Sequence, residues 1–180
     1  AEWKEDGEYG AGWYVGHIGL QEKYCRGYYE MIMKCSPCKG RSTDFWSAFW
    51  LVDHTYPSAG GPGGCEIDIV ENFGPHYQTS CFWVSETEEE QGLSSELYEG
   101  WFEEADFSAE YHTYGLLWDE DCYKIYVDGV LFAASDYAYG TSEVPETVWL
   151  GICVPSAGPN RDPDQPVEMV VEEMGIWQKP

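Results

Sequence analysis

Short runs rich in Val, Ile, Tyr, Phe and Trp recur along the chain between clusters of Gly, Pro, Asp and Ser. This pattern predicts an all-β sandwich or barrel rather than alternating strands and helices. The clearest case is 122–134, where two β-prone runs flank an Asp-Gly dipeptide at 128–129, the pair best suited to a tight hairpin turn. We therefore predict a hairpin there. Further strands are expected over 27–34, 45–52 and 167–177, and 45–52 is apolar on both faces, as a central buried strand would be.

The length of 180 residues fits one compact domain, residues 1–180. With 43% hydrophobic residues the chain can bury a core, which excludes general disorder. The formal charge of −24 repels phosphate backbones and anionic lipid heads, so neither nucleic acid nor a membrane surface is an expected partner. The longest strongly apolar run, 45–52, is far shorter than the roughly 20 residues that span a bilayer.

The seven cysteines and four histidines do not form a metal-binding pattern. Cys35 and Cys38 have the spacing of half a zinc knuckle or a redox pair, but no second pair follows them. We interpret them as either a small disulfide or two reduced thiols in a turn, beside Pro37 and Gly40. The histidines are scattered singly, which does not indicate a catalytic zinc or iron site.

The most informative segment is 63–74, in which Glu66, Asp68 and Glu71 interrupt an otherwise β-branched run. In an extended strand Glu66 and Asp68 share one face, but regular alternation would turn Glu71 inward. A β-bulge near 69–70 that absorbs one residue returns Glu71 to the face of the other two acids. The sequence therefore predicts a bulged strand with three carboxylates on one surface.

Such a surface favours glycoside hydrolysis. Glu66 and Glu71 would lie about four strand steps apart, roughly 13 Å between Cα atoms, and their long side chains can lean together. A carboxyl separation of about 5–5.5 Å is what a retaining glycosidase needs for its nucleophile and its acid/base. Asp68 could orient Glu66 and share its proton. Two simpler interpretations are a solvated acidic face and a calcium site, although a strand is a poor source of the six to eight oxygens that calcium takes.

The segment resembles the active-site strand of glycoside hydrolase family 16, a family of β-jelly-roll enzymes. The similarity covers about residues 13–178. Further matching elements are 24–34, 45–51, 111–118, 126–129 and 170–177.

The resemblance implies a jelly-roll β-sandwich of two antiparallel sheets. It assigns Glu66 as nucleophile, Asp68 as assisting acid and Glu71 as general acid/base. The bulged form of this motif is typical of members that act on β-1,3-glucans and galactans. By the same resemblance we expect a retaining endo-glycosidase, secreted and monomeric, that cleaves β-1,3- or β-1,3(4)-linkages of a neutral polysaccharide. Trp46, Trp83 and Trp118 are the expected substrate-binding aromatics.

Several departures from the family pattern bear on this assignment. The chain begins near the family's third or fourth strand, so N-terminal strands are expected to be missing or reduced. Residues 60–64 replace a Trp that many glucan-cleaving members carry, and Phe82 replaces a His. No cofactor is expected, and a structural calcium ion stays an open alternative. Two further functions stay open: an endo-β-galactosidase or agarase-type enzyme of the same mechanism, and a carbohydrate-binding module without catalysis.

Overall fold

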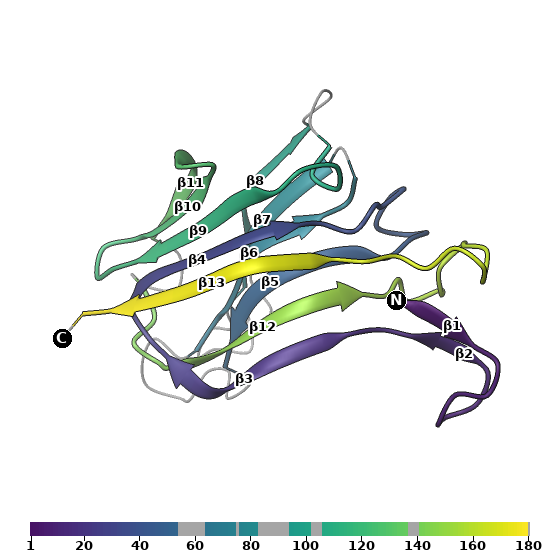
Figure 1. Ribbon diagram of the computed structural model, residues 1–180. Coiled ribbons are helices and arrows are strands. Elements are labelled where there is room, and N and C mark those ends of the chain that lie inside the picture. The colour runs from purple at the N-terminus through teal and green to yellow at the C-terminus, as the bar shows by residue number, and fades with distance from the viewer. Residues whose placement is uncertain (54–63, 75, 83–93, 102–105, 137–140, 180) are drawn as a thin grey trace.

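The computed structural model describes residues 1–179, apart from 54–63, 75, 83–93, 102–105 and 137–140. Two antiparallel sheets pack face to face, and a short hairpin lies at one end of the larger sheet (Figure 1). None of the described residues belongs to a helix with the length and apolar character needed to span a bilayer. The predicted all-β sandwich of two antiparallel sheets is confirmed.

The smaller sheet has five strands. In spatial order they are β11 (Val130–Ser135), β10 (Tyr123–Val127), β9 (His112–Trp118), β4 (Gly27–Lys34) and β13 (Val170–Gln178). All of the pairings are antiparallel.

The larger sheet has six strands. In spatial order they are β3 (His17–Tyr24), β12 (Glu146–Cys153), β5 (Trp46–Val52), β6 (Glu66–Asn72), β7 (His76–Phe82) and β8 (Ser94–Trp101). The separate hairpin pairs β1 (Glu2–Lys4) with β2 (Gly12–Tyr14). As predicted, β5 is a central strand, since it pairs with both β12 and β6.

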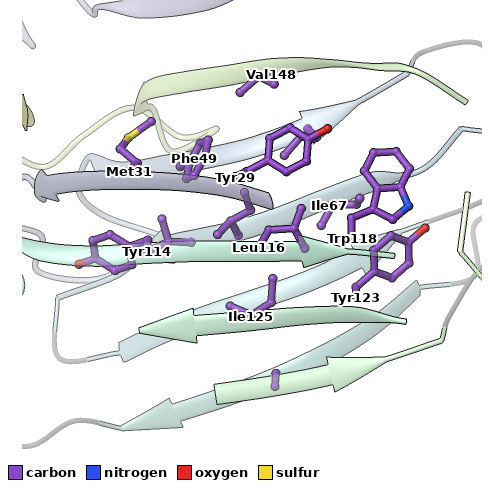
Figure 2. Close-up of a cluster of buried hydrophobic side chains, with 14 of the residues drawn as sticks. Tyr29, Met31, Phe49, Ile67, Tyr114, Leu116, Trp118, Tyr123, Ile125 and Val148 are labelled. Carbon is purple, nitrogen blue, oxygen red and sulfur yellow. The ribbon is translucent and has the colours of Figure 1, made fainter. Parts of the chain in front are cut away.

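Alternation along the strands builds the core. On β4, the residues at 27, 29, 31 and 33 are buried and the residues between them are half-buried, so one face of the smaller sheet turns inward. Phe49 and Leu51 of β5 and Ile67 of β6 meet that face from the other sheet, and all three are fully buried. Figure 2 shows side chains from both sheets in this shared core.

The hairpin predicted at 128–129 is present between β10 and β11. Asp128 has φ of 50° and Gly129 has φ of 76°, the left-handed conformations that a tight hairpin turn with two central residues requires. The Asp128 carboxylate also accepts the backbone N–H of Thr113 at 2.9 Å, so this turn is tied to β9.

All seven cysteines are free thiols. Of the two alternatives for Cys35 and Cys38, the reduced pair is therefore confirmed and the disulfide is wrong. Cys35, Cys65 and Cys81 are buried in the main core. Burial raises the pKa of Cys35 to about 12, although hydrogen bonds from Tyr114 and Ser47 oppose it, so the thiol stays protonated at neutral pH.

Candidate active site

The acidic strand β6 carries the predicted bulge. Its register against β5 skips Ile69, because Asp68 and Val70 pair with consecutive residues of β5. The register against β7 shifts in the same place, between Asp68 and Glu71. Ile69 and Val70 are both fully buried in the core. The bulge therefore absorbs one residue on the inner side of the strand, as the sequence predicted.

The three carboxylates of β6 consequently share the outer face of the larger sheet, which we call the acidic face. Glu66 is half-buried, whereas Asp68 is 5% exposed and Glu71 is 9% exposed. Glu71 does not point into the core, since the indole Nε1 of Trp46 donates a hydrogen bond to its Oε1 at 3.1 Å. The predicted common face of the acids is confirmed.

Asp68 lies between the two glutamates in sequence and is the most deeply buried of the three acids. Its burial, followed by the negative charges of Glu71 and Glu66, raises the pKa of its carboxyl well above the ordinary range, and the nearby Arg41 opposes this only in part. Asp68 therefore stays protonated at a pH where an exposed aspartate would be ionised. A neutral carboxyl beside two others can donate a hydrogen bond and hold a mobile proton.

Trp46 is fixed on its other side. Its ring contacts Phe73, with ring centroids 5.6 Å apart, and the Arg41 guanidinium lies 5.2 Å from the centroid of Phe73. Trp46 pairs in register with Cys153 of β12. Burial and the charges of the three acids raise the pKa of the Cys153 thiol to about 12, so it adds no further negative charge here.

An aromatic cluster occupies the acidic face on the β5, β12 and β3 side of the acids. Trp50 pairs with Asp68 on one side and with Trp149 on the other, and the two indoles stack with centroids 6.1 Å apart. His17 of β3 meets the Trp149 ring edge-on, with ring centroids 5.1 Å apart. We call His17, Trp50 and Trp149 the tryptophan platform. Trp149 lies against Gly19, where a Cβ would be 2.6 Å from its ring.

The tryptophan platform was not identified from the sequence. Its three members come from three strands and meet only through the pairing of β3, β12 and β5. The available signal was alternation, because Trp149 directly follows a core residue, Val148, and must face outward. Burial lowers the pKa of His17, so its imidazole is uncharged at neutral pH.

The opposite side of the acids is polar. Gln78 pairs with Glu71 and Ser80 pairs with Asp68 on β7. The Gln78 amide Nε2 donates a hydrogen bond to Ser80 Oγ at 2.9 Å, and both side chains are buried. The acids are therefore flanked by aromatic rings on one side and by an amide and a hydroxyl on the other.

Of the three tryptophans predicted to bind substrate, the structure places only Trp46 beside the acids. The prediction for Trp118 is wrong. Trp118 is fully buried, its Nε1 donates to the carbonyl of Ser142 at 3.1 Å, and it packs beside Tyr123 in the core (Figure 2). The reason is alternation along β9, which turns Trp118 inward with Leu116. Trp83 lies outside the described residues.

Within the described part of the chain, no group of three or more His, Cys, Asp or Glu side chains is arranged to hold a metal ion. The acids of β6 are suited to proton transfer and to nucleophilic attack, since two carboxylates flank a protonated third one on the outer face of the sheet.

Comparison with known structures supports this fold. A κ-carrageenase from Zobellia galactanivorans superposes over 92% of this chain and 71% of that chain, with a TM-score of 0.73 and 19% identity. The laminarinase catalytic domain from Thermotoga maritima MSB8 superposes over 97% of this chain and 74% of that chain, with a TM-score of 0.66 and 21% identity. At these identities the similarity establishes the fold.

Sequence comparison goes further. The glucan endo-1,3-beta-glucosidase of Cryptopygus antarcticus is 29% identical over 112 residues, which cover 59% of this chain and 37% of that protein. The matched stretch is thus little more than a third of that relative. The family model described as Glycosyl hydrolases family 16 matches residues 14–150, which include all of the acidic strand, its bulge and its three carboxylates. With that match over three quarters of its length, the chain belongs to glycosyl hydrolases family 16.

Proposed function

We propose that this protein is a retaining endo-glycosidase that hydrolyses internal β-1,3- or β-1,3(4)-linkages of a neutral glucan. The observation that carries the proposal is the bulge at Ile69, which keeps Glu71 on the acidic face with Glu66 and Asp68. Without the bulge the strand would present only two acids. Family membership and the name of the Cryptopygus relative support the same activity.

The proposed mechanism is a double displacement. Glu66 attacks the anomeric carbon while Glu71 gives its proton to the leaving glycosidic oxygen, which forms a glycosyl-enzyme ester on Glu66. Glu71, now ionised, takes a proton from a water molecule that attacks the same carbon and releases Glu66. The configuration of the anomeric carbon is inverted twice and therefore retained.

Asp68 acts in this scheme as a positioning residue. Because burial and its two acidic neighbours keep it protonated, it can donate a hydrogen bond to a neighbouring carboxylate. The Trp46 indole holds Glu71 at 3.1 Å and fixes the direction from which that acid approaches the leaving oxygen. Preorganised donors of this kind lower the barrier because they need no rearrangement during the reaction.

The substrate class follows from the surroundings of the acids. Pyranose rings present apolar C–H faces, which stack on aromatic rings such as those of the tryptophan platform. The positive charge of Lys23, on β3 of the same sheet, is already paired with the Asp53 carboxylate, with 2.6 Å between Nζ and Oδ2. With a formal charge of −24, the protein repels sulfated polymers, so a neutral polysaccharide fits better than a carrageenan.

The decisive experiment is a polysaccharide panel of laminarin, mixed-linkage glucan, agarose and κ-carrageenan. Products are identified by mass, and NMR reports the configuration of the first-formed reducing end. We expect laminarin or mixed-linkage glucan to be cleaved with β-anomers formed first. Cleavage of agarose alone would replace the glucan proposal by the endo-β-galactosidase alternative, and α-anomers would exclude double displacement.

A matched pair of variants tests the catalytic assignment. Glu66→Gln is expected to fold normally and to lose hydrolysis, whereas Glu110→Gln, at an exposed glutamate far along the chain, is expected to match the wild type. Unchanged activity of Glu66→Gln would exclude the mechanism. If the wild-type protein binds oligosaccharides tightly but releases no reducing ends, the chain is a non-catalytic binding module. An extracellular location and a monomeric state are part of the same proposal.

A further inference from the structure

A second aromatic surface lies on the outer face of the smaller sheet, the sheet that does not carry the acids. Trp177 of β13 is 54% exposed, and its ring centroid lies 5.6 Å from that of Tyr28 on β4, with an angle of 32° between the rings. Both side chains point away from the core, since Tyr29 and Ile176, their neighbours in sequence, face inward. We call Tyr28 and Trp177 the outer aromatic pair.

Two glycines let these rings lie flat on the sheet. A Cβ at Gly175 would be 2.2 Å from the ring of Trp177, and a Cβ at Gly115 would be 2.7 Å from the hydroxyl of Tyr28. Gly175 and Gly115 pair with the same residue of β4, Glu30, from its two sides. The rings therefore lie over the two sites that flank Glu30.

The pair is held in place by polar contacts. The Tyr28 hydroxyl donates to Glu30 Oε2 at 2.6 Å. Burial, followed by the bond to Glu30 and its charge, raises the pKa of Tyr28 to about 12, so the phenol stays a neutral donor. Next to Trp177, the Gln178 amide donates to the carbonyls of Cys25 at 2.9 Å and Arg26 at 3.0 Å, which ties the end of β13 to the start of β4.

We propose that the outer aromatic pair is a second carbohydrate-binding site, which holds a neutral polysaccharide chain on the opposite side of the molecule from the acids. The exposed ring of Trp177, beside the half-buried ring of Tyr28, fits the C–H face of a pyranose, and the neighbouring Glu30 carboxylate can accept hydrogen bonds from sugar hydroxyls. Because little freedom is lost on binding, even a small contact gives measurable affinity.

Other occupants fit less well. Nucleic acid and sulfated polymers are repelled by the formal charge of −24. Two rings are far less surface than the roughly 1,200 Å² or more that a stable protein interface buries. A purely structural role is also possible for the two rings, because aromatic rings that cover glycines stabilise a sheet. That role does not require a Trp side chain that is 54% exposed.

The test is electrophoresis through gels that contain laminarin, mixed-linkage glucan or agarose, in which binding to the polymer retards the protein. Trp177→Ala is compared with Leu131→Ala, which removes another exposed apolar side chain, on β11 of the same sheet. Trp50→Ala, alone and combined with Trp177→Ala, separates binding at the acidic face from binding at the outer pair. Turnover of a short soluble oligosaccharide is measured for each variant.

Trp177→Ala is expected to weaken binding to at least one polymer about tenfold, the scale of one lost ring contact, and to leave turnover of the short substrate unchanged. Trp177→Phe, which still covers Gly175, is expected to lose less of the binding to the polymer than Trp177→Ala does. The proposal would be overturned if all three polymers retarded Trp177→Ala as strongly as the wild type. It would also be overturned if Leu131→Ala lost as much binding as Trp177→Ala. These outcomes are independent of whether the acids hydrolyse glucan, which the release of reducing ends reports separately.

Discussion

The hydrogen bond from the Trp46 indole to the Glu71 carboxylate offers the sharpest test of the proposed mechanism. Trp46→Phe keeps an aromatic ring beside Phe73 but removes the N–H that donates to Glu71 Oε1 at 3.1 Å. Glu71 gains negative charge as it gives up its proton, and a hydrogen bond to a charged group contributes about 1.5–3 kcal/mol. If that energy orients Glu71 in the transition state, kcat/KM should fall roughly 10- to 150-fold.

The assay is the initial rate of reducing-end release from the cleaved glucan, measured beside thermal unfolding. Trp3→Phe is the matched control, because the Trp3 indole also donates to a carboxylate, that of Glu5 at 2.9 Å, but on the exposed β1–β2 hairpin. It should change the rate less than twofold. A Trp46→Phe rate within twofold of the wild type, alongside an inactive Glu71→Gln, would refute the argument that the indole positions the acid.

Three further predictions concern stability. Asp44 and Arg161 form a buried ion pair at 2.7 Å, so Asp44→Asn should cost about 3–5 kcal/mol and lower Tm by roughly 6–20 °C at pH 7. Burial alone would raise the pKa of Asp44, but hydrogen bonds from Arg161 and the backbone outweigh it and lower that pKa. The contribution of the ion pair to the free energy of unfolding is therefore lost as the pH falls through this lowered value. The unfolding curves of the variant and the wild type should converge in acid. Burial raises the pKa of the Glu146 carboxyl well above its ordinary value, so the wild-type protein should lose stability as the pH rises above that ordinary value. Urea titrations at pH 5 and pH 9 should show that Glu146→Gln loses less stability over this range. Trp118→Phe removes the indole N–H that donates to the Ser142 carbonyl and should cost about 0.5–1.5 kcal/mol in unfolding free energy, with KM for the glucan unchanged.

Features set by neighbours in sequence could be predicted well. The hairpin at 128–129 requires only that two adjacent residues adopt left-handed conformations, which Asp and Gly do readily. The bulge at Ile69 could also be predicted, because regular alternation would have buried Glu71 beside Ile67 and left a charge in the core.

Features set by contacts between distant strands could not be predicted from the sequence. A Trp in a β-prone run fits either face of a sheet. Alternation along β9 places Trp118 on the face of Leu116, and only the packing of that face against the other sheet shows that both are in the core. The tryptophan platform depends in the same way on the order β3–β12–β5. Composition shows that many aromatic residues are present, but it does not show which of them meet.

The buried thiols give this fold a set of internal reporters. Cys35, Cys65 and Cys81 are at most 1% exposed and unpaired, and they sit after β4, before β6 and within β7. A thiol reagent can reach them only when the surrounding strands separate, so labelling rates resolved by peptide mass would measure how often each region opens. Because none of the seven cysteines is bridged in the folded protein, refolding from denaturant requires no oxidant and can be carried out under reducing conditions.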